Sequence, residues 1–300
     1  MSRSSATISE LVPSFRRSLR AKNRADNTIK NYEGAARTFV AWLTDEGLSE
    51  SVVSVEQQHV ERFIGHQLDT RSSSTAASRY RCLQQFFRWA AREGEVEHSP
   101  MANMEPPSVE EKVPAVLSDD ELRRLLAACD GKDFSQRRDN ALIRLLLDSG
   151  LRAGETVGID VGDLDLDGQV VHVVGKGAKG RLCPFGRKTA EALDRYERAR
   201  RQHKHSAEPA LWLALRGPMT QSGLSQMLRK RGASVGIDGL HPHKFRHTFA
   251  HRWLANEGNE GDLQLIAGWS SRQMLDRYGA SAKAERARDA HRRLGLGDLL

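Results

Sequence analysis

The sequence predicts a two-domain, mainly α-helical protein whose second domain carries a small β-hairpin. Three observations lead to this prediction. The chain has 300 residues, which is too long for one small core and suits two domains. Apolar side chains recur at helical spacing in two regions, separated by a proline-rich stretch at residues 98–113. Two short β-branched or alternating runs flank a glycine-rich turn. We therefore expect domains at 1–97 and 114–300, joined by a linker at 98–113.

Residues 1–97 are expected to form four helices. The two clearest lie at 25–47 and 74–94, where apolar side chains recur every three or four residues along one face. Each of these stretches ends in a glycine, the preferred residue where a helix stops. Weaker helical patterns occupy 7–22 and 55–69. The expected N-terminal domain is therefore a small helical unit.

The second domain is expected to combine further helices with one hairpin. Ser118 and Glu121 have the pattern of a capping box, so a helix begins there, and another helix ends at Gly150. The runs 168–175 and 181–186 flank the glycine-rich turn in the pattern of a hairpin. The remaining expected helices cover approximately residues 188–203, 220–233, 243–256 and 259–268.

The charge distribution indicates a polyphosphate partner. The net formal charge is +7, yet residues 171–252 hold 17 Lys or Arg against 5 Asp or Glu, and residues 1–37 hold 8 against 3. An excess of this size is typical of nucleic-acid binding, although charged runs also occur on ordinary solvated surfaces. We expect no membrane partner, because no segment combines the basic excess with a long apolar helical face.

Several other classes of protein are disfavoured. No apolar run approaches the roughly 20 residues that span a bilayer, and the N-terminal residues lack the apolar centre of a signal peptide. The three cysteines, Cys82, Cys129 and Cys183, are scattered and form no CxxC pair. We therefore expect a protein of the reducing cytoplasm.

Five short motifs follow one another in the second domain: SGLRAGE (149–155), GKGAKGR (175–181), HPHKFRH (241–247), AGWS (267–270) and DRYGAS (276–281). Their order and spacing resemble the catalytic motifs of the tyrosine recombinase (phage integrase) family in its Xer-like layout. The resemblance also covers the helical N-terminal region and the linker. It implies a two-domain DNA clamp, with a helical SAM-like core-binding domain at 1–97 and a mixed α+β catalytic domain at 114–300.

The resemblance implies that a tyrosine attacks a DNA phosphodiester. Tyr278 matches the family's nucleophile, which forms a 3′-phosphotyrosyl bond and frees a 5′-hydroxyl. Arg152 in GLR and Arg246 in HxxR match two arginines that bind the phosphate oxygens, a task suited to a planar, permanently charged group. His243 stands three residues before Arg246, on the same helical face. It matches a histidine that helps to manage the tyrosine proton.

Three further residues complete the site that the resemblance implies. Lys176, in the hairpin turn, matches the general acid that protonates the leaving oxygen, with Lys179 as the alternative in the same turn. Trp269 stands where the commonest pattern has histidine, and its indole N–H either donates to the phosphate or only packs. Glu155 is expected to orient His243 or the arginines. The candidate DNA contacts beside this site are Arg79, Arg81, Lys179, Arg181 and Lys244.

The residues also allow a zinc site as an alternative. His243, His247 and His251 recur at i, i+4 and i+8, which places three imidazoles along one stripe of a helix. The HExxH glutamate is absent, however, and Lys244 and Arg246 would repel a cation. The resemblance likewise implies neither a metal nor a cofactor.

The resemblance finally implies the partners and the task. The expected substrate is double-stranded DNA with a specific recombination site, bound by a homo-oligomer. In similar enzymes this is a tetramer around two sites, whose C-terminal tails dock on neighbouring subunits. Accessory DNA-binding proteins are further candidate partners. The expected role is integration or excision of a mobile element; the alternatives are a non-catalytic accessory factor, a DNA-relaxing topoisomerase and a chromosome-dimer resolution enzyme.

Overall fold

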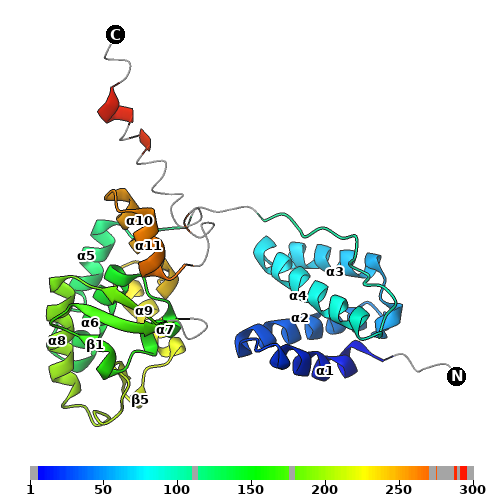
Figure 1. The fold of residues 1–300 in the computed structure, drawn as a ribbon, viewed down its shortest axis with the longest axis horizontal. Helices are drawn as coiled ribbons and strands as arrows, with labels where there is room; N and C mark the ends of the chain where they lie inside the picture. Colours follow the sequence, from blue (N-terminus) through cyan, green and yellow to red (C-terminus); the bar gives the residue numbers. More distant parts are fainter. Residues whose placement is uncertain are drawn as a thin grey trace. The chain divides into compact units, whose positions relative to one another are not determined.

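The computed structural model describes residues 6–109, 114–175, 180–269, 275, 287–288 and 291–295 of the chain. It separates into two compact units, Met1–Lys112 and Val113–Leu300, and each unit has its own hydrophobic core (Figure 1). Within the described residues, no helix combines the length and the apolar composition that crossing a membrane requires.

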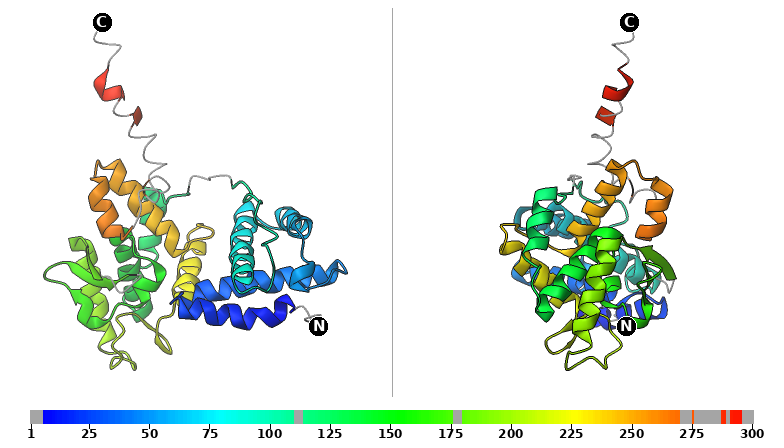
Figure 2. Two further views of the ribbon diagram at one scale, coloured as in Figure 1. Left: turned by 45° about the vertical axis from the view of Figure 1, so that its right-hand side comes forward. Right: turned by 90° about the vertical axis from the view of Figure 1, so that its left-hand side faces the viewer.

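The N-terminal unit is built from four α-helices. They are α1 (Ile8–Ala21), α2 (Asp26–Asp45), α3 (Gln57–Thr70) and α4 (Ser73–Arg92), with a 3-10 turn, η1, at Val52–Ser54. Helix α2 contacts each of the other three, so it is the central element of the unit (Figure 2). Phe15 of α1 packs edge-to-face on Phe86 of α4, and Phe39 of α2 does the same on Phe63 of α3. These ring pairs add stabilisation to the burial of their apolar area.

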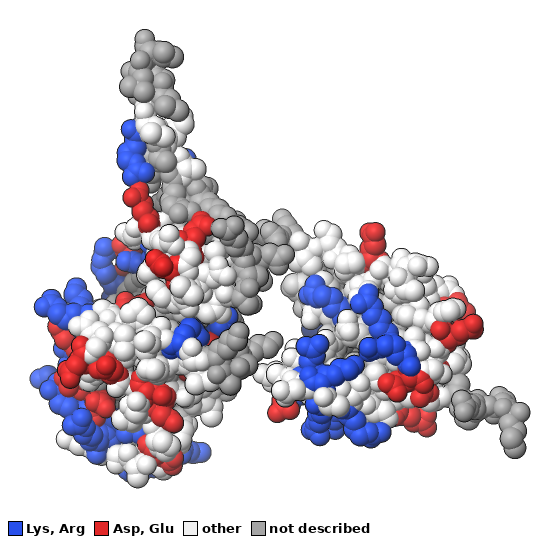
Figure 3. Space-filling model, in the orientation of Figure 1, with Lys and Arg blue, Asp and Glu red and all other residues white. Residues whose placement is uncertain are grey.

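One surface of the N-terminal unit is strongly basic. Figure 3 shows Lys and Arg side chains gathered on the face of this unit that is turned to the viewer. A groove between α2 and α4 is lined by Lys30 and Arg79 together with the small residues Gly34, Ser74 and Ser78. The small side chains leave room beside the two cations for an extended anionic ligand.

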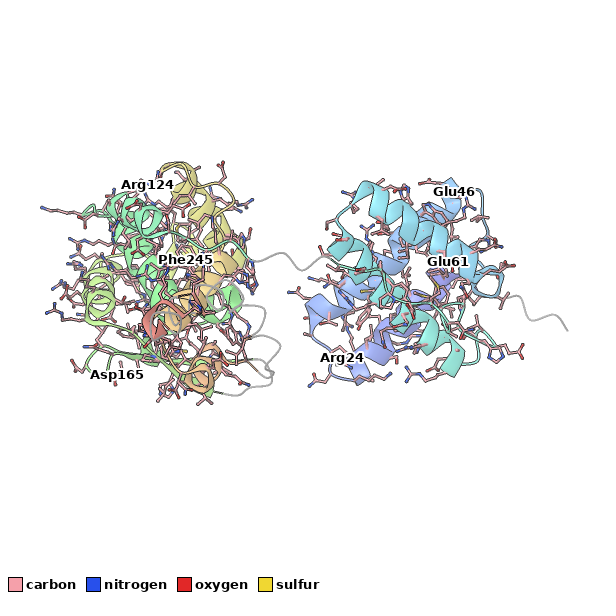
Figure 4. All side chains as sticks on the ribbon, turned by 90° about the horizontal axis from the view of Figure 1, so that it is seen from above. Arg24, Glu46, Glu61, Arg124, Asp165 and Phe245 are labelled. Carbon is pink, nitrogen blue, oxygen red and sulfur yellow. The ribbon has the colours of Figure 1, made fainter. Side chains whose placement is uncertain are left out.

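The described part of the C-terminal unit is also mostly helical. Its α-helices are α5 (Asp119–Ala127), α6 (Phe134–Ser149), α7 (Ala153–Val157), α8 (Arg187–Arg200), α9 (Gln221–Ala233), α10 (Pro242–Ala255) and α11 (Glu260–Ala267), and η2 (Val161–Asp163) is a 3-10 turn. Helix α6 is central and contacts α8 and α10. Phe245 of α10, labelled in Figure 4, is fully buried in this core.

Three short strands form an antiparallel sheet in the order β1–β2–β3. They are β1 (Leu164–Asp165), β2 (Val170–Val174) and β3 (Gly180–Pro184), and a second antiparallel pair consists of β4 (Leu213–Ala214) and β5 (Gly217–Pro218). Val171, Val173 and Cys183 are buried, so one face of the hairpin belongs to the core. Because side chains alternate along a strand, Arg181 lies on the same face as Cys183.

The predicted fold class is confirmed, and the differences concern short elements. The structure contains the four N-terminal helices, the capping box of Ser118 and Glu121, and the β2–β3 hairpin. The sequence does not predict α7, β1 or the β4–β5 pair, because elements of five residues or fewer are too short to show a period of apolar side chains. The turn 176–179 lies outside the described residues.

A glycine sets the distance between the end of α6 and α10. Gly150 ends α6 with a φ of 58°, in the left-handed region that glycine adopts without strain. A Cβ added at Gly150 would lie 2.4 Å from Cδ1 of Phe249 in α10. Glycine therefore permits both the turn and the close approach of the two helices.

Replacing Gly150 by alanine is expected to lower the free energy of unfolding by about 2–4 kcal/mol, because overpacking against Phe249 adds to the cost of the left-handed backbone. Gly239 is a matched control, since its φ is 61° and a Cβ there would meet nothing within 4 Å. Gly239→Ala should cost only about 1–2 kcal/mol. Urea unfolding measures both losses, and equal losses would contradict the packing argument.

Candidate active site

Three arginines converge on the end of helix α11. The last carbonyls of a helix have no partner within the helix and form the negative end of its dipole. Here three consecutive carbonyls accept one guanidinium each. The pairs are Arg181 Nε with the Ile266 carbonyl (2.9 Å), Arg246 Nη2 with the Ala267 carbonyl (2.6 Å) and Arg152 Nη2 with the Gly268 carbonyl (3.2 Å).

These arginines come from segments that are far apart in the sequence. Arg152 is the N-cap residue of α7, Arg181 lies on β3, and Arg246 lies in α10. Gly268 ends α11 in the left-handed conformation, with a φ of 62°. The end of α11 is thus the point at which the first, second and third sequence motifs meet the fourth.

Arg246 is the most deeply buried of the three and is only 1% exposed. Its Nη1 donates to the Gly150 carbonyl at 2.6 Å, so the guanidinium joins the end of α6 to the end of α11. The guanidinium carbon also lies 5.2 Å from the ring centre of Trp269, which is itself buried. A cation–π contact of this kind is worth about 0.5–2 kcal/mol. The indole therefore supports one side of Arg246.

Glu155 binds the other two arginines. Its carboxylate accepts from Nη1 of Arg152 at 2.9 Å and from Nη1 and Nη2 of Arg181 at 3.0 and 2.9 Å. The backbone N–H of Arg152 is a further donor at 2.9 Å. Burial raises the pKa of this carboxyl, but the bonds to the two arginines outweigh burial and lower the pKa to about 2. Glu155 is therefore ionised and fixes both guanidiniums.

The arrangement allows Arg152 and Arg246 to act on one ligand. They bond to adjacent carbonyls, so their guanidiniums lie in one small region at the end of α11. The Arg152 side chain is 38% exposed, which leaves part of its guanidinium open to solvent. A guanidinium has five N–H donors, and donors beyond those used on Glu155 and Gly268 suit an anion with several oxygens, such as a phosphate.

His243 lies in the first turn of α10, three residues before Arg246. It is exposed, whereas Arg246 faces the core. The imidazole therefore stands on the solvent side of the buried arginine. Lys244, the next residue, is half-buried.

Three of the expected site residues, Lys176, Lys179 and Tyr278, lie outside the described residues. Leu275, three residues before Tyr278 in the chain, is described and is 4% exposed. It belongs to a hydrophobic cluster that includes Phe249 of α10 and Trp269. The chain between Trp269 and Tyr278 therefore returns to the part of the molecule that holds Arg246.

The expected DNA contacts differ in how far they reach the surface. Arg81 is exposed on α4, whereas Arg79 is half-buried, donates to Gln67, and has its pKa lowered by burial and by the nearby Arg71. The Arg181 side chain is only 14% exposed, and all three of its nitrogens donate to protein acceptors. This position departs from the expected surface contact, because the buried face of β3 directs Arg181 toward α11.

The zinc alternative is not supported by the described residues. Among them, no group of three His, Cys, Asp or Glu side chains is arranged to hold a metal ion. His243, His247 and His251 therefore share a stripe of α10 without forming a ligand set.

The sequence does not reveal the acceptors that organise the site. The carbonyls of residues 266–268 belong to the backbone, so no residue type marks them. Their only signal in the sequence is Gly268, because a glycine directly after a helical pattern indicates a left-handed helix end. Such an end leaves carbonyls available for side-chain donors.

Comparison with known protein families and relatives agrees with this geometry. The chain matches the model of the phage integrase family over residues 115–285 and that of the phage integrase N-terminal SAM-like domain over residues 11–94. Tyrosine recombinase XerD of Lacticaseibacillus casei is 32% identical over 250 residues, which cover 82% of this chain and 85% of that protein. Tyrosine recombinase XerC of Azotobacter vinelandii is 32% identical over 246 residues, covering 81% and 82%.

Solved structures share the fold. The post-cleavage complex of the XerH site-specific recombinase with palindromic difH substrate has a TM-score of 0.76 at 18% identity, covering 95% of this chain and 84% of that one. The Tn1549 transposon integrase in complex with transposon right-end DNA has a TM-score of 0.71 at 22% identity, covering 97% and 100%. The combination of a helical SAM-like domain and a mixed catalytic domain is thus confirmed.

Replacing Glu155 by glutamine tests the charge balance at this site. Because the pKa of Glu155 is lowered from its ordinary 4.5 to about 2, the unfolded chain binds a proton more readily than the folded one. The carboxylate therefore stabilises the fold at neutral pH, and this contribution is lost as the pH falls from about 4.5 to 2. The wild type should exceed Glu155→Gln by on the order of 3 kcal/mol at pH 7.

Urea unfolding of both proteins between pH 7 and pH 3 measures this difference. The gap in the free energy of unfolding should narrow toward the acidic end. A gap that stays constant over the whole range would contradict an ionised Glu155 held by two arginines.

Proposed function

The chain belongs to the phage integrase family of tyrosine recombinases, and on this premise we propose that Tyr278 cuts and rejoins DNA strands at a specific recombination site. The observation that carries the proposal is the pair Arg152 and Arg246, whose guanidiniums are bonded to adjacent carbonyls at the end of α11. Two fixed cations in one small region suit the extra negative charge of a phosphodiester under attack.

The other tyrosines support the choice of Tyr278 as nucleophile. The chain has four tyrosines. Tyr32 packs on Phe15 in the N-terminal core, and Tyr80 is 1% exposed and donates to the Met104 carbonyl. Tyr196 is fully buried, and burial raises its pKa to about 12, which is unfavourable for a nucleophile. Each of these three already has a structural role.

The proposed reaction is a transesterification. The phenol oxygen of Tyr278 bonds to phosphorus while its proton passes to His243, and the bond from phosphorus to the 5′-oxygen breaks. Lys176 supplies a proton to that leaving oxygen, and the reverse sequence with a new 5′-hydroxyl reseals the strand. Arg152 and Arg246 donate to the non-bridging oxygens throughout. Trp269 supports Arg246, and its indole N–H is a further candidate donor to the phosphate.

Double-stranded DNA is the proposed partner of both domains. The excess of 17 Lys or Arg over 5 Asp or Glu in residues 171–252 would position the phosphate backbone, with Lys179 and Lys244 among the contacts. The basic face of the N-terminal unit, with Arg79 and Arg81, would do the same for a second stretch of duplex (Figure 3). In this assignment residues 1–97 are the core-binding domain, 98–113 the linker and 114–300 the catalytic domain.

We further propose a homo-oligomer on DNA, with four copies around two sites. Recombination exchanges strands between two duplexes, and each duplex is cut on both strands, so four nucleophiles are needed. The apolar end LGLGDLL (294–300) is a candidate docking segment, and its first residue, Leu294, is 60% exposed. Accessory DNA-binding proteins remain further candidate partners.

For the biological task we propose integration or excision of a mobile element. The supporting observation is Trp269, because the motif GWSSRQMLDRYGAS departs from the GHS pattern of enzymes that resolve chromosome dimers. The similarity to XerC and XerD proteins favours chromosome-dimer resolution as the second candidate. Selecting bound duplexes from a random library and locating the selected sequence in the genome decides between them. Repeats flanking the gene indicate a mobile element, and a single distant chromosomal site indicates dimer resolution.

A nicked duplex carrying the selected site tests the reaction itself. The wild type should form a covalent protein–DNA adduct that survives denaturation, because release of the nicked fragment prevents resealing. Tyr278→Phe should bind the duplex and form no adduct. Tyr196→Phe is the matched control and should still form one, since it loses only a structural hydroxyl, at a cost of about 1 kcal/mol in stability. An adduct formed by Tyr278→Phe would place the nucleophile elsewhere, and loss of the adduct on adding a chelator would restore the zinc alternative.

Arg152→Ala should slow cleavage at saturating DNA on the order of 10²–10³-fold, because it removes a donor aimed at the developing charge. DNA affinity should change little, since many other phosphate contacts remain. Arg123→Ala, which removes an exposed arginine outside residues 171–252, controls for the loss of one charge. Single-turnover cleavage and DNA titration measure the two effects. Equal losses in cleavage and binding would contradict a role in the transition state.

A further inference from the structure

Arg181 forms a centre of contacts that the proposed reaction does not use. Its three nitrogens donate to the Ile266 carbonyl and to both carboxylate oxygens of Glu155, at 2.9–3.0 Å. The side chain is 14% exposed, and it lies on β3, five residues after Lys176. A group so enclosed and so fully bonded has little capacity left for a DNA phosphate.

The charges around Glu155 explain why a second arginine is needed. Glu155 is 7% exposed at its side chain and lies against Arg152, so its negative charge cancels much of the field of that guanidinium. Arg152, Arg181 and Glu155 together carry a net charge of +1, whereas Arg152 and Glu155 alone would carry none. With Arg181 present, one cation remains in excess beside the place where the phosphate would bind.

We propose that Arg181 is a positioning residue for cleavage: it neutralises Glu155 and thereby keeps the charge of Arg152 available to the scissile phosphate. This inference rests on the proposed function and deepens it. Arg181 also bonds to the end of α11, so it fixes the base of the hairpin that carries Lys176 against the helix that leads to Tyr278. It acts through Glu155 and α11 and does not touch DNA.

The space at Gly268 is consistent with this role. A Cβ added at Gly268 would lie 2.9 Å from Cζ and 3.0 Å from Nη1 of Arg181. The absence of a side chain at Gly268 therefore leaves room for this guanidinium to reach both Glu155 and the Ile266 carbonyl. The planar group is suited to that task because its donors diverge within one plane, which a lysine ammonium cannot reproduce.

The test is single-turnover cleavage of the nicked duplex at saturating DNA. Arg181→Met should cleave roughly tenfold to a hundredfold more slowly than the wild type, the range typical of lost supporting contacts. The fraction of protein that forms adduct should stay unchanged, because that amplitude reports correctly folded enzyme. Arg181→Lys, which keeps the charge but not the planar geometry, should fall between the two.

A double variant gives the decisive readout. If Arg181 neutralises Glu155, then removing the carboxylate charge makes the neutralisation unnecessary. Arg181→Met combined with Glu155→Gln should therefore cleave faster than Arg181→Met alone. A double variant no faster than Arg181→Met would overturn the inference, since neither a DNA contact nor a purely structural role predicts such recovery.

The salt dependence of DNA binding separates positioning from direct contact. The slope of log affinity against log salt should be the same for Arg181→Met and the wild type. A slope smaller by about 0.9, the value for one lost phosphate contact, would overturn the inference. Gly268→Ala should slow cleavage as Arg181→Met does, whereas Gly239→Ala, with a φ of 61° and open space, should not. Equal rates for these two alanine variants would also contradict it.

The result for the wild type distinguishes the two proposals. A wild type that forms no covalent adduct would refute the proposed function and this inference with it. A wild type that cleaves, together with an Arg181→Met variant that cleaves equally fast, would refute the inference alone.

Discussion

The C-terminal unit depends on one interaction, the binding of three guanidiniums by the last carbonyls of α11. A helix end exposes acceptors and carries a partial negative charge, and side chains with several donors satisfy both. Arg152, Arg181 and Arg246 come from α7, β3 and α10, so a single helix end brings together segments that are 21 to 116 residues away along the chain. The structural bonds and the proposed catalytic bonds use different donors of the same two arginines.

This arrangement explains how cations can be held near one another in a largely buried place. Each guanidinium has backbone carbonyls or Glu155 as partners, so the cost of removing its charge from water is offset locally. Arg246 is further fixed by the Gly150 carbonyl and the ring of Trp269. Because these partners are rigid, the cations need not reorganise when charge develops on a phosphate, and such preorganisation is usually the largest contribution to catalysis of this kind.

The sequence predicts the helices and the motif residues well, for physical reasons that also mark its limits. Long helices such as α2 and α4 show several turns of apolar periodicity, whereas α7 and β1 are too short to show any. Arg181 was expected on a DNA-facing surface because it follows a basic turn. Its partners Glu155 and Ile266 lie 26 and 85 residues away, and one of them is a backbone carbonyl, so no local pattern could identify them.

The most direct test of the account is a crystal structure of the protein on cleaved duplex with vanadate between Tyr278 and the 5′-hydroxyl. Vanadate adopts the five-coordinate geometry of a phosphoryl group under attack. The account predicts that Arg152 and Arg246 both donate to the vanadate oxygens while their bonds to the Gly268 and Ala267 carbonyls persist. Guanidiniums that have left these carbonyls, or that face separate phosphates, would contradict it.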